Sequence, residues 1–343
     1  MWVYIMNKLS VVSQLVSQNK LPRKSSGIAF APSNIALCKY WGKRDCELNL
    51  PVTGSLSISL GNKGANTEVS IMTNQQYDIV NLNEVVLDKQ TEFYKRVVVF
   101  LDLFRPRGFV FRVSTNTNLP VGAGIASSAC GFASLTMALD DLFDWQLSEQ
   151  ALSILARLGS GSAARSLWQG FVEWEVGIQD DGMDSFAKPL SNVWPEFQIS
   201  LIVFSSIKKK ISSRNAMELT RKTSPFYLQW SERVKYALLN IKKAIVNKDF
   251  EKLGEFSEAN SLEMHGLMMT TQPSIVYSLS ETILCQQAVW QAREDGLPIY
   301  FTQDAGPNLK LLFLKQDLAE ILMRFPGIEA ISPWERNINV QQK

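Results

Sequence analysis

Histidine is almost absent from this chain of 343 residues, which contains only one, His265. A Ser-His-Asp triad would have to use that residue, and zinc sites built on two or three histidines are excluded. If the chain is an enzyme, we therefore expect proton transfer to depend on a carboxylate or a lysine. Positive charge in its site would come from Lys and Arg.

Cysteines are also few, and none of the four (Cys38, Cys46, Cys130 and Cys285) belongs to a C-x-x-C pair. A cysteine-based zinc site is therefore not expected, and four reduced thiols are typical of a cytoplasmic protein. No segment approaches the ~18–20 consecutive apolar residues that a membrane helix needs, so we expect no membrane partner.

An excess of one charge is missing too. Lys and Arg number 35, Asp and Glu number 33, and the formal net charge is +2. This balance opposes a nucleic-acid-binding module, which would need a strong basic excess. With 46% apolar and 20% charged residues, the composition is that of a globular protein, and the length suggests two domains.

Acidic residues are missing from positions 1–27, which hold four basic residues and several serines. Ile5, Leu9, Val12 and Val16 would share one face of a helix. This combination is typical of an organelle transit peptide, and the alternative is a short additional helix or a disordered extension. The sequence leaves both open, and we treat residues 1–26 as an N-terminal extension.

The rest of the sequence predicts strands followed by helices in each of two halves. Strands are predicted over 27–34, ending at Pro32, and near 55–60, 67–72, 77–82, 109–114, 171–176, 199–204, 298–303 and 309–314. Helices are predicted from the glycine-rich segment at 118–133 to Phe143, and over 148–158, 227–245, 250–268 and 274–295. This order predicts an α+β protein with domains at 27–189 and 190–343.

The segment P-x-G-x-G-I-A-S-S-A, which begins at Pro120, is the first candidate site. Gly122 and Gly124 allow the backbone to approach a ligand closely. Ser127 and Ser128 fall where a helix begins, and the free N–H groups of a first turn suit a phosphate. The spacing matches neither the P-loop nor the dinucleotide motif, and a glycine-rich turn with a capping serine is the alternative.

Three further segments combine polar groups in ways that suit a ligand site. K-Y-W-G-K-R-D, from Lys39, has three cations and two aromatics. G-S-G-S-A-A-R-S-L, from Gly159, surrounds Arg165 with small residues, and a guanidinium offers a bidentate fork for phosphate. D-A-G-P-N, from Asp304, places a carboxylate at the end of an apolar strand. Alone, each segment also fits a structural role: the first a solvated charged turn, the second a loop with an N-capping serine, and the third a β-turn.

In this order, the four segments resemble the GHMP kinase superfamily and, within it, the diphosphomevalonate decarboxylase family. The resemblance extends from about Gly27 to the C-terminal helix. A-P-S-N-I-A-L-C-K-Y-W-G-K-R-D with L-N-L-P is similar to the family's N-terminal signature, and G-I-A-S-S-A-C-G-F-A to its ATP phosphate loop. G-S-G-S-A-A-R-S-L with G-F-V-E-W is similar to its substrate segment. The pair K-Y-W-G-K-R-D and D-A-G-P-N is specific to the decarboxylase branch.

The resemblance implies a two-domain GHMP kinase fold. An N-terminal α/β sandwich domain would bind ATP, a C-terminal domain would be ferredoxin-like α+β, and the active site would lie in the cleft between them. The implied reaction is the ATP-dependent decarboxylation of mevalonate 5-diphosphate to isopentenyl diphosphate, with Mg²⁺. The family is usually homodimeric.

The resemblance also implies residue roles. Asp304 would lie by the 3-hydroxyl of the substrate, and Lys39 would help keep Asp304 ionised. The diphosphate would be bound by Tyr40, Lys43, Ser160, Ser162 and Arg165. The ATP phosphates would be held by Pro120, Gly122, Gly124, Ser127, Ser128 and Ser213, with Ser128 also on magnesium. From the helix pattern around it, His265 is expected to be a hydrogen-bonded helix residue, and the alternative is a substrate-side role, because the polar Asn260 interrupts the apolar stripe.

Two positions depart from the family pattern. Ala164 replaces a cysteine in the substrate segment, and Gln303 replaces an aromatic before the aspartate. They leave open the phosphorylation state of the substrate, because relatives include a decarboxylase for mevalonate 5-phosphate and a mevalonate 3-kinase that does not decarboxylate. A non-catalytic metabolite-binding relative should lack at least one of its key residues, but Lys39, Ser128, Arg165 and Asp304 are all present.

Overall fold

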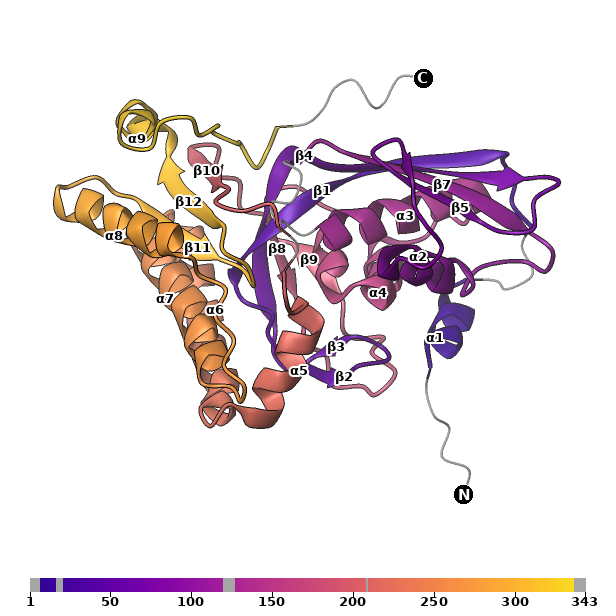
Figure 1. The fold of residues 1–343 in the computed structure, drawn as a ribbon, viewed down its shortest axis with the longest axis horizontal. Coiled ribbons are helices and arrows are strands. Elements are labelled where there is room, and N and C mark those ends of the chain that lie inside the picture. Colours follow the sequence, from indigo (N-terminus) through magenta and orange to yellow (C-terminus); the bar gives the residue numbers. More distant parts are fainter. Residues whose placement is uncertain (1–6, 17–20, 120–126, 208, 336–343) are drawn as a thin grey trace.

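The computed structural model describes residues 7–16, 21–119, 127–207 and 209–335. A seven-stranded sheet dominates the first half of the chain, and a three-stranded sheet lies in the second half (Figure 1). Both sheets carry helices, which confirms the α+β class. No helix within these ranges combines the length and apolarity needed to cross a bilayer.

The large sheet is built around two long strands, β1 (Ser26–Cys38) and β4 (Ser55–Met72). They pair antiparallel, and β4 also pairs with β7 (Val110–Thr117) and β8 (Phe171–Trp174). The sheet is completed by β5 (Ile79–Leu82), β6 (Val85–Val86) and β9 (Ala187–Pro189). Its order is β6-β5-β7-β4-β8-β9, with β1 beside β4.

Two strand predictions are corrected here. The segments 55–60 and 67–72 belong to one strand, β4, and β1 does not end at Pro32 but continues to Cys38. The chain passes the proline because a register shift lies between Pro32 and Asn34, and Pro32 faces Gly64. A bulge of this kind accommodates the missing N–H of proline within a strand.

Three helices pack on one face of the large sheet: α2 (Glu92–Leu101), α3 (Ser127–Phe143) and α4 (Glu149–Gly159) (Figure 1). Ser148 caps α4 by accepting a hydrogen bond from the backbone N–H of Ala151. A short 3-10 helix, η1 (Gly161–Arg165), follows α4 directly. The hairpin of β2 (Lys43–Asp45) and β3 (Leu50–Pro51) lies beyond the end of β1.

The small sheet has the antiparallel order β10 (Phe197–Ile202), β12 (Leu309–Leu314), β11 (Tyr300–Gln303). Its helices are α5 (Ser213–Thr223), α6 (Tyr227–Asn247), α7 (Phe250–Met269), α8 (Ser280–Glu294) and α9 (Leu318–Arg324), with η2 (Lys315–Asp317) before α9. The helix predicted at 227–245 is α6, and its apolar stripe is buried at Trp230, Val234, Ile241 and Ile245. The predicted helix at 274–295 begins only at Ser280, because Ile275 and Tyr277 are buried in an extended segment after Pro273.

The N-terminal extension contains a short helix, α1 (Lys8–Leu15), capped by the side chain of Asn7. Val11, Val12 and Val16 are buried in the core of the first half. Leu9, which was expected on the same face, is half exposed, and Ile5 lies outside the described residues. The structure thus contains a short helix in this extension, and it packs near α4.

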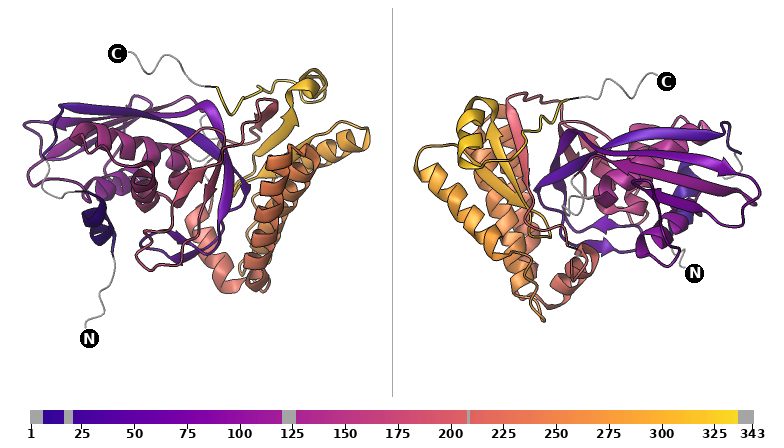
Figure 2. Two further views of the ribbon diagram at one scale, coloured as in Figure 1. Left: turned by 180° about the vertical axis from the view of Figure 1, so that it is seen from behind. Right: turned by 45° about the horizontal axis from the view of Figure 1, so that its top comes forward.

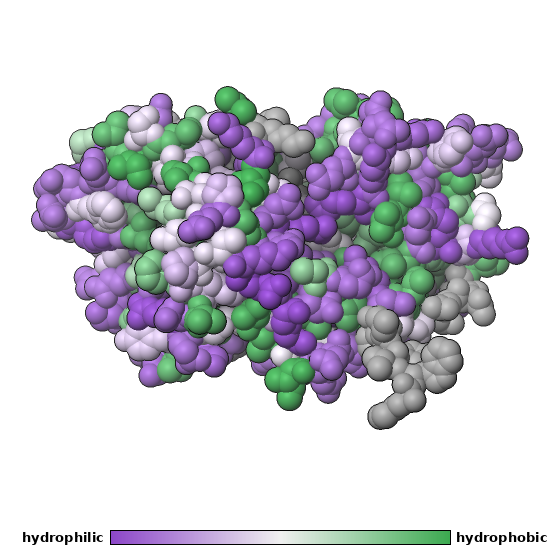
Figure 3. All heavy atoms as spheres, turned by 60° about the horizontal axis from the view of Figure 1, so that its bottom comes forward, coloured by the Kyte–Doolittle hydropathy of each residue, from purple (hydrophilic) through white to green (hydrophobic). Residues whose placement is uncertain are grey.

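The two halves meet near the C-terminal ends of β1 and β11. Helix α7 packs against both strands, and the Thr302 hydroxyl lies 3.4 Å from the Ala36 carbonyl oxygen. Figure 2 shows the two sheets inclined toward each other along this junction. On the face drawn in Figure 3, hydrophilic residues gather down the middle of the molecule, over the region where the halves meet.

Candidate active site

Asp304 lies in the turn that follows β11, and the turn is held by hydrogen bonds. The backbone N–H of Gly306 donates to the Asp304 carbonyl at 2.7 Å. The Gln303 amide donates to the Gly306 carbonyl at 2.8 Å, and Gln286 donates to the Gln303 side chain at 2.9 Å. Gln303, which departs from the family pattern, thus fixes the shape of the turn that presents Asp304.

The Asp304 carboxylate lies between two buried lysines. Lys39 Nζ is 2.8 Å from Oδ1, and Lys310 Nζ is 2.8 Å from Oδ2. Both lysine side chains are 2% exposed, whereas that of Asp304 is 30% exposed. The predicted pair of Lys39 and Asp304 is therefore brought together, and Lys310 is a third member that the sequence reasoning missed. Its signal was a lysine inside the apolar strand L-K-L-L-F-L.

Opposing effects act on the charge of Asp304. Burial alone would raise the pKa of its carboxyl, but the ammonium groups of Lys310 and Lys39 outweigh burial and hold that pKa well below its usual range. Burial lowers the pKa of Lys39, and the charge of Asp304 opposes that effect. The site therefore holds a permanent carboxylate anion that still faces the solvent.

Helix α7 supports both members of the predicted pair. Asn260 Oδ1 accepts a hydrogen bond from the Lys39 backbone N–H at 2.7 Å. His265 Nε2 lies 3.1 Å from the Asp304 carbonyl oxygen. Burial lowers the pKa of His265 to about 4, so its ring is neutral and Nε2–H donates to that carbonyl. The expectation of a hydrogen-bonded helix histidine is confirmed.

Three predicted serines form a row of hydroxyl groups. Ser128 Oγ lies 3.4 Å from Ser160 Oγ, and Ser160 Oγ lies 3.3 Å from Ser162 Oγ. Ser128 belongs to the first turn of α3, Ser160 ends α4 and Ser162 lies in η1. The structure thus brings the glycine-rich segment and the predicted substrate segment together. Of that segment, Pro120, Gly122, Gly124 and the side chain of Ser127 lie outside the described residues.

Arg165 is buried at the end of η1, where its Nη1 donates to Ser55 Oγ at 2.5 Å. Burial lowers its pKa to about 10, so it remains charged at neutral pH. Among the described residues, neither Arg165 Nε nor the buried Tyr40 hydroxyl has a hydrogen-bond partner. Buried donors of this kind fit a polar or anionic ligand that completes the site.

Tyr40 and Arg165 pack against the same aromatic ring, that of Trp174. The Tyr40 ring lies 4.8 Å from that of Trp174, and the Arg165 guanidinium lies 5.7 Å from the same Trp174 ring. A Cβ atom at Gly161 would come within 2.8 Å of the Tyr40 hydroxyl. Glycine at 161 therefore allows Tyr40 to approach the row of serine hydroxyls.

Two further cations converge on the end of α4, next to Ser160. Lys43 Nζ donates to Asn49 at 2.6 Å, and the Asn49 amide donates to the Arg157 carbonyl at 2.9 Å. Arg96, which the sequence reasoning missed, donates to the Gly159 carbonyl at 3.3 Å. This end of α4 therefore carries positive charge from two different elements.

Burial and, to a smaller extent, the charge of Arg214 lower the pKa of Lys43 to about 8. Arg214 lies in the first turn of α5, directly after Ser213 in the segment I-S-S-R. Among the described residues, Ser213 makes no hydrogen bond to the three serine hydroxyls, and its neighbour Ser212 caps the helix. The segment therefore contributes a cation, Arg214, that the sequence reasoning did not single out.

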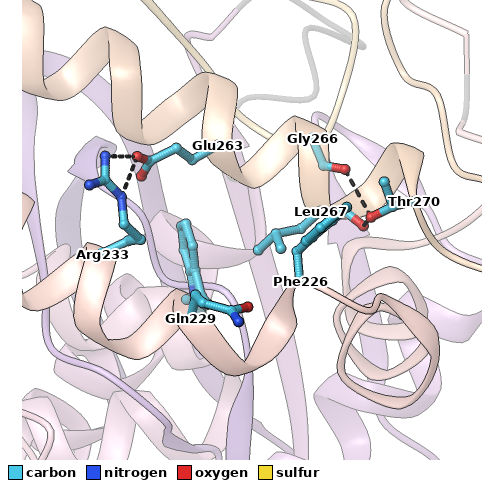
Figure 4. Close-up of a pocket in the computed structure, with 8 residues that line it drawn as sticks. Phe226, Gln229, Arg233, Glu263, Gly266, Leu267 and Thr270 are labelled. Atoms are coloured by element: carbon cyan, nitrogen blue, oxygen red, sulfur yellow. Dashed lines mark hydrogen bonds and ion pairs between the residues drawn. The ribbon is translucent and has the colours of Figure 1, made fainter.

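A separate groove lies between α6 and α7, on the other side of α7 from Asp304. It is lined by Phe226, Trp230, Arg233, Glu263 and Leu267 (Figure 4). Arg233 Nε donates to Glu263 Oε1 at 2.8 Å across it. The only cation among its described lining residues is already neutralised by Glu263 and most of its exposed lining is apolar, so this groove does not extend the candidate site.

Two family descriptions match the chain. Residues 31–187 match the diphosphomevalonate decarboxylase-like N-terminal domain, and residues 199–339 match the mevalonate 5-diphosphate decarboxylase C-terminal domain. Among curated proteins, diphosphomevalonate decarboxylase of Debaryomyces hansenii is 32% identical over 330 residues, covering 90% of this chain and 84% of the relative. That of Saccharomyces cerevisiae is 32% identical over 332 residues, covering 91% and 84%.

Solved structures agree with these relatives. Mevalonate diphosphate decarboxylase from Staphylococcus aureus superimposes with a TM-score of 0.85 at 35% identity, covering 91% of this chain and 97% of that one. The enzyme from Enterococcus faecalis gives a TM-score of 0.83 at 37% identity, covering 90% and 97%. A structure of MDDEF in complex with MVAPP, AMPPCP and magnesium gives 0.82 at 38% identity, covering 90% and 99%.

Proposed function

Because the chain belongs to the diphosphomevalonate decarboxylase family, we propose how its own residues carry out the family reaction. The chain is an enzyme with the two-domain GHMP kinase fold, and it catalyses the ATP-dependent decarboxylation of mevalonate 5-diphosphate to isopentenyl diphosphate. The observation that carries the residue assignment is the buried Lys39–Asp304 ion pair, which joins the two halves of the molecule.

Arg165, Tyr40 and the serines of η1 would bind the substrate diphosphate. Arg165 Nε and the Tyr40 hydroxyl are buried donors without a partner among the described residues, which supports a ligand at this position. Ser160 and Ser162 add hydroxyl groups, and Lys43 adds a cation. A diphosphate accepts hydrogen bonds at several oxygens, so this donor-rich set matches it better than it matches a neutral ligand.

The first turn of α3 would bind the phosphates of ATP. Ser128 presents its hydroxyl beside Ser160, and free backbone N–H groups at a helix start suit phosphate oxygens. The described residues contain no group of three His, Cys, Asp or Glu side chains that would hold a metal ion. The Ser128 hydroxyl would help to hold a magnesium ion beside the ATP phosphates, because Mg²⁺ prefers oxygen ligands and is usually bound in part through substrate phosphates.

Asp304 would orient the 3-hydroxyl of the substrate, and Lys39 would compensate charge next to it. The reaction first forms a bond between the 3-oxygen and the γ-phosphorus, with release of ADP. The bond from the third carbon to that oxygen then breaks, and phosphate leaves with the electron pair. A carbocation remains, and the carboxylate departs as CO₂ while its bonding pair forms the new double bond. A fixed carboxylate at Asp304 would stabilise this cation.

We also propose that the enzyme is a cytoplasmic homodimer. The homodimer rests on the family resemblance, and the cytoplasm on the four cysteines, all of which lie in the described residues and form no disulfide. Sedimentation of the purified chain at several concentrations tests the first proposal. The second proposal is tested by localising a fluorescent fusion to the full chain. Import into an organelle would contradict it, and it would require α1 to be exposed as an import signal.

The function is tested by comparing three substrates. CO₂ release and ADP formation are measured with mevalonate, its 5-phosphate and its 5-diphosphate, and we expect equal amounts of both products with the 5-diphosphate alone. Preference for the 5-phosphate would identify the phosphomevalonate decarboxylase, and ADP without CO₂ would identify the 3-kinase. No turnover with any of them would identify a non-catalytic protein.

A further inference from the structure

Lys310 is the least expected charge in the small sheet. It lies on the central strand β12, paired in register with Leu201 of β10 and Thr302 of β11. The residues on either side of it, Leu309 and Leu311, are fully buried. An ammonium group in such a place is costly unless an anion compensates it, and its partner is Asp304 Oδ2 at 2.8 Å.

Each of the two lysines contacts a different oxygen of the Asp304 carboxylate. Lys39 approaches from the end of β1 and takes Oδ1, whereas Lys310 approaches from β12 and takes Oδ2. Each oxygen of Asp304 is therefore anchored by its own cation from a different half of the molecule. A carboxylate held at both oxygens has little freedom to rotate, and its exposed edge points toward the solvent.

Asp304 is surrounded by cations from four different segments of the chain. Besides Lys39 and Lys310, Lys209 lies in the segment after β10 and Arg165 in η1, and both interact electrostatically with the carboxylate. His265 on α7 contributes a neutral ring. Four cations thus face one anion. A carboxylate in such a field is a poor proton acceptor, because protonation would leave the cations uncompensated.

We propose that Lys310 is a positioning residue for Asp304, holding its carboxylate as a fixed anion that orients the 3-hydroxyl and stabilises the carbocation rather than removing the hydroxyl proton. This proposal rests on the function proposed above and deepens it. The hydroxyl proton passes to a non-bridging oxygen of the transferred phosphoryl group as the new O–P bond forms. It then leaves with the phosphate as HPO₄²⁻, so no side chain has to accept it.

The decisive experiment measures kcat and KM as functions of pH for Lys310→Met. If Lys310 positions a fixed anion, kcat falls roughly 10- to 100-fold at every pH while KM for both substrates stays within about 3-fold. The acid limb of the pH profile of kcat also moves to higher pH, because Asp304 stays buried but loses Lys310, one of the two cations in direct contact with its carboxylate. If Asp304 is instead a general base, the same change strengthens the base. A kcat on the alkaline plateau equal to or above that of wild type would overturn the proposal.

Two variants separate positioning from a general loss of structure. Lys310→Arg keeps a cation, and we expect it to recover part of the lost kcat. Lys315→Gln removes an exposed lysine just beyond the end of the same strand, and kcat and its pH profile should not change. Failure of Lys310→Arg to exceed Lys310→Met would count against a role for the charge.

A double-mutant cycle with Asp304→Asn tests the coupling of Lys310 to Asp304 even if the protein shows no catalytic turnover. The free energy of unfolding is measured for wild type, Lys310→Met, Asp304→Asn and the double variant, and we expect the two changes to be strongly non-additive. If the wild type does not decarboxylate mevalonate 5-diphosphate, the proposed function fails and this cycle still decides the pairing. Additive changes would overturn the proposal for Lys310.

Discussion

Ser128 and Ser160 bring their hydroxyl oxygens within 3.4 Å of each other although 32 residues separate them in the chain. Ser128 belongs to the helix that follows the glycine-rich segment, and Ser160 ends the helix before η1. The group that would bind ATP therefore directly adjoins the group that would bind the substrate diphosphate. The transferred phosphoryl group therefore has only a short distance to move. Removal of the Ser128 hydroxyl should mainly affect ATP, and removal of the Ser160 hydroxyl should mainly affect the diphosphate substrate.

Ser128→Ala should lower kcat/KM for ATP about 10-fold, because a hydrogen bond to a charged group contributes roughly 1.5 kcal/mol or more. KM for mevalonate 5-diphosphate, measured at saturating ATP, should change by less. Initial rates with each substrate varied in turn provide the measurement. Ser13→Ala removes an exposed hydroxyl from α1 and should leave both constants unchanged. Equal losses for both substrates would contradict the separate sides of the site.

Arg165→Lys should raise KM for the diphosphate substrate about 10-fold or more with a smaller effect on kcat, because each lost hydrogen bond to a charged group costs roughly 1.5 kcal/mol or more. Lysine keeps the charge but loses the fork and its contact with Ser55. The same variant should discriminate less between the 5-diphosphate and the 5-phosphate. Unchanged selectivity between these two compounds would remove Arg165 from the diphosphate site.

Asp304→Asn should abolish turnover and leave binding of ATP and of mevalonate 5-diphosphate nearly intact. The amide has almost the shape of the carboxylate but does not carry the charge that faces the developing cation. Calorimetric titration of the variant measures the two affinities, and CO₂ release measures turnover. Near-normal activity would show that the assignment of Asp304 is wrong.

Some of this site could be predicted because the information is local. The glycine-rich and D-A-G-P-N segments, and the stripe of α6, are each contained in fewer than about 20 consecutive residues. Lys39 and Asp304 were paired through the family motif, although 265 residues separate them. The periodicity of residues 227–245 likewise predicted a helix, and α6 spans Tyr227–Asn247.

Other contacts could not be predicted because they depend on which strands become neighbours. Nothing in L-K-L-L-F-L tells which anion meets Lys310, since that depends on the register of β12 against β11. The Ser55 partner of Arg165 lies 110 residues away on β4. Periodicity also failed at α1, where the buried side contains Val11 in place of Leu9, because packing against the rest of the first half decides which face is covered.

Val12→Asp should lower the free energy of unfolding by at least about 3 kcal/mol, because it places an uncompensated charge in the core beneath α1. Leu9→Asp, at a half-exposed position of the same helix, should change it by less than about 0.5 kcal/mol. Urea unfolding provides the measurement. Equal stability of the two variants would mean that α1 does not contribute to the fold in solution.

The single histidine gives the stability of the protein a distinctive dependence on pH. Burial lowers the pKa of His265 from 6.5 to about 4 in the folded state, so the unfolded chain binds a proton at higher pH than the folded chain does. Below pH 6.5 protonation therefore favours unfolding, and stability is lost as the pH falls from 6.5 to 4. The total loss is about 3 kcal/mol, since each pKa unit corresponds to about 1.4 kcal/mol.

His265→Gln should remove this dependence while keeping a side chain that donates to the Asp304 carbonyl. Urea unfolding at pH 7.5 and 5.5 should show a loss of about 1.4 kcal/mol in the wild type and almost none in the variant. The comparison is clean because the chain has no other histidine, and ordinary carboxyl groups titrate at lower pH. Equal slopes for the two proteins would mean that His265 is accessible to protons in the folded state, and that the carbonyl of Asp304 is not held by a neutral ring.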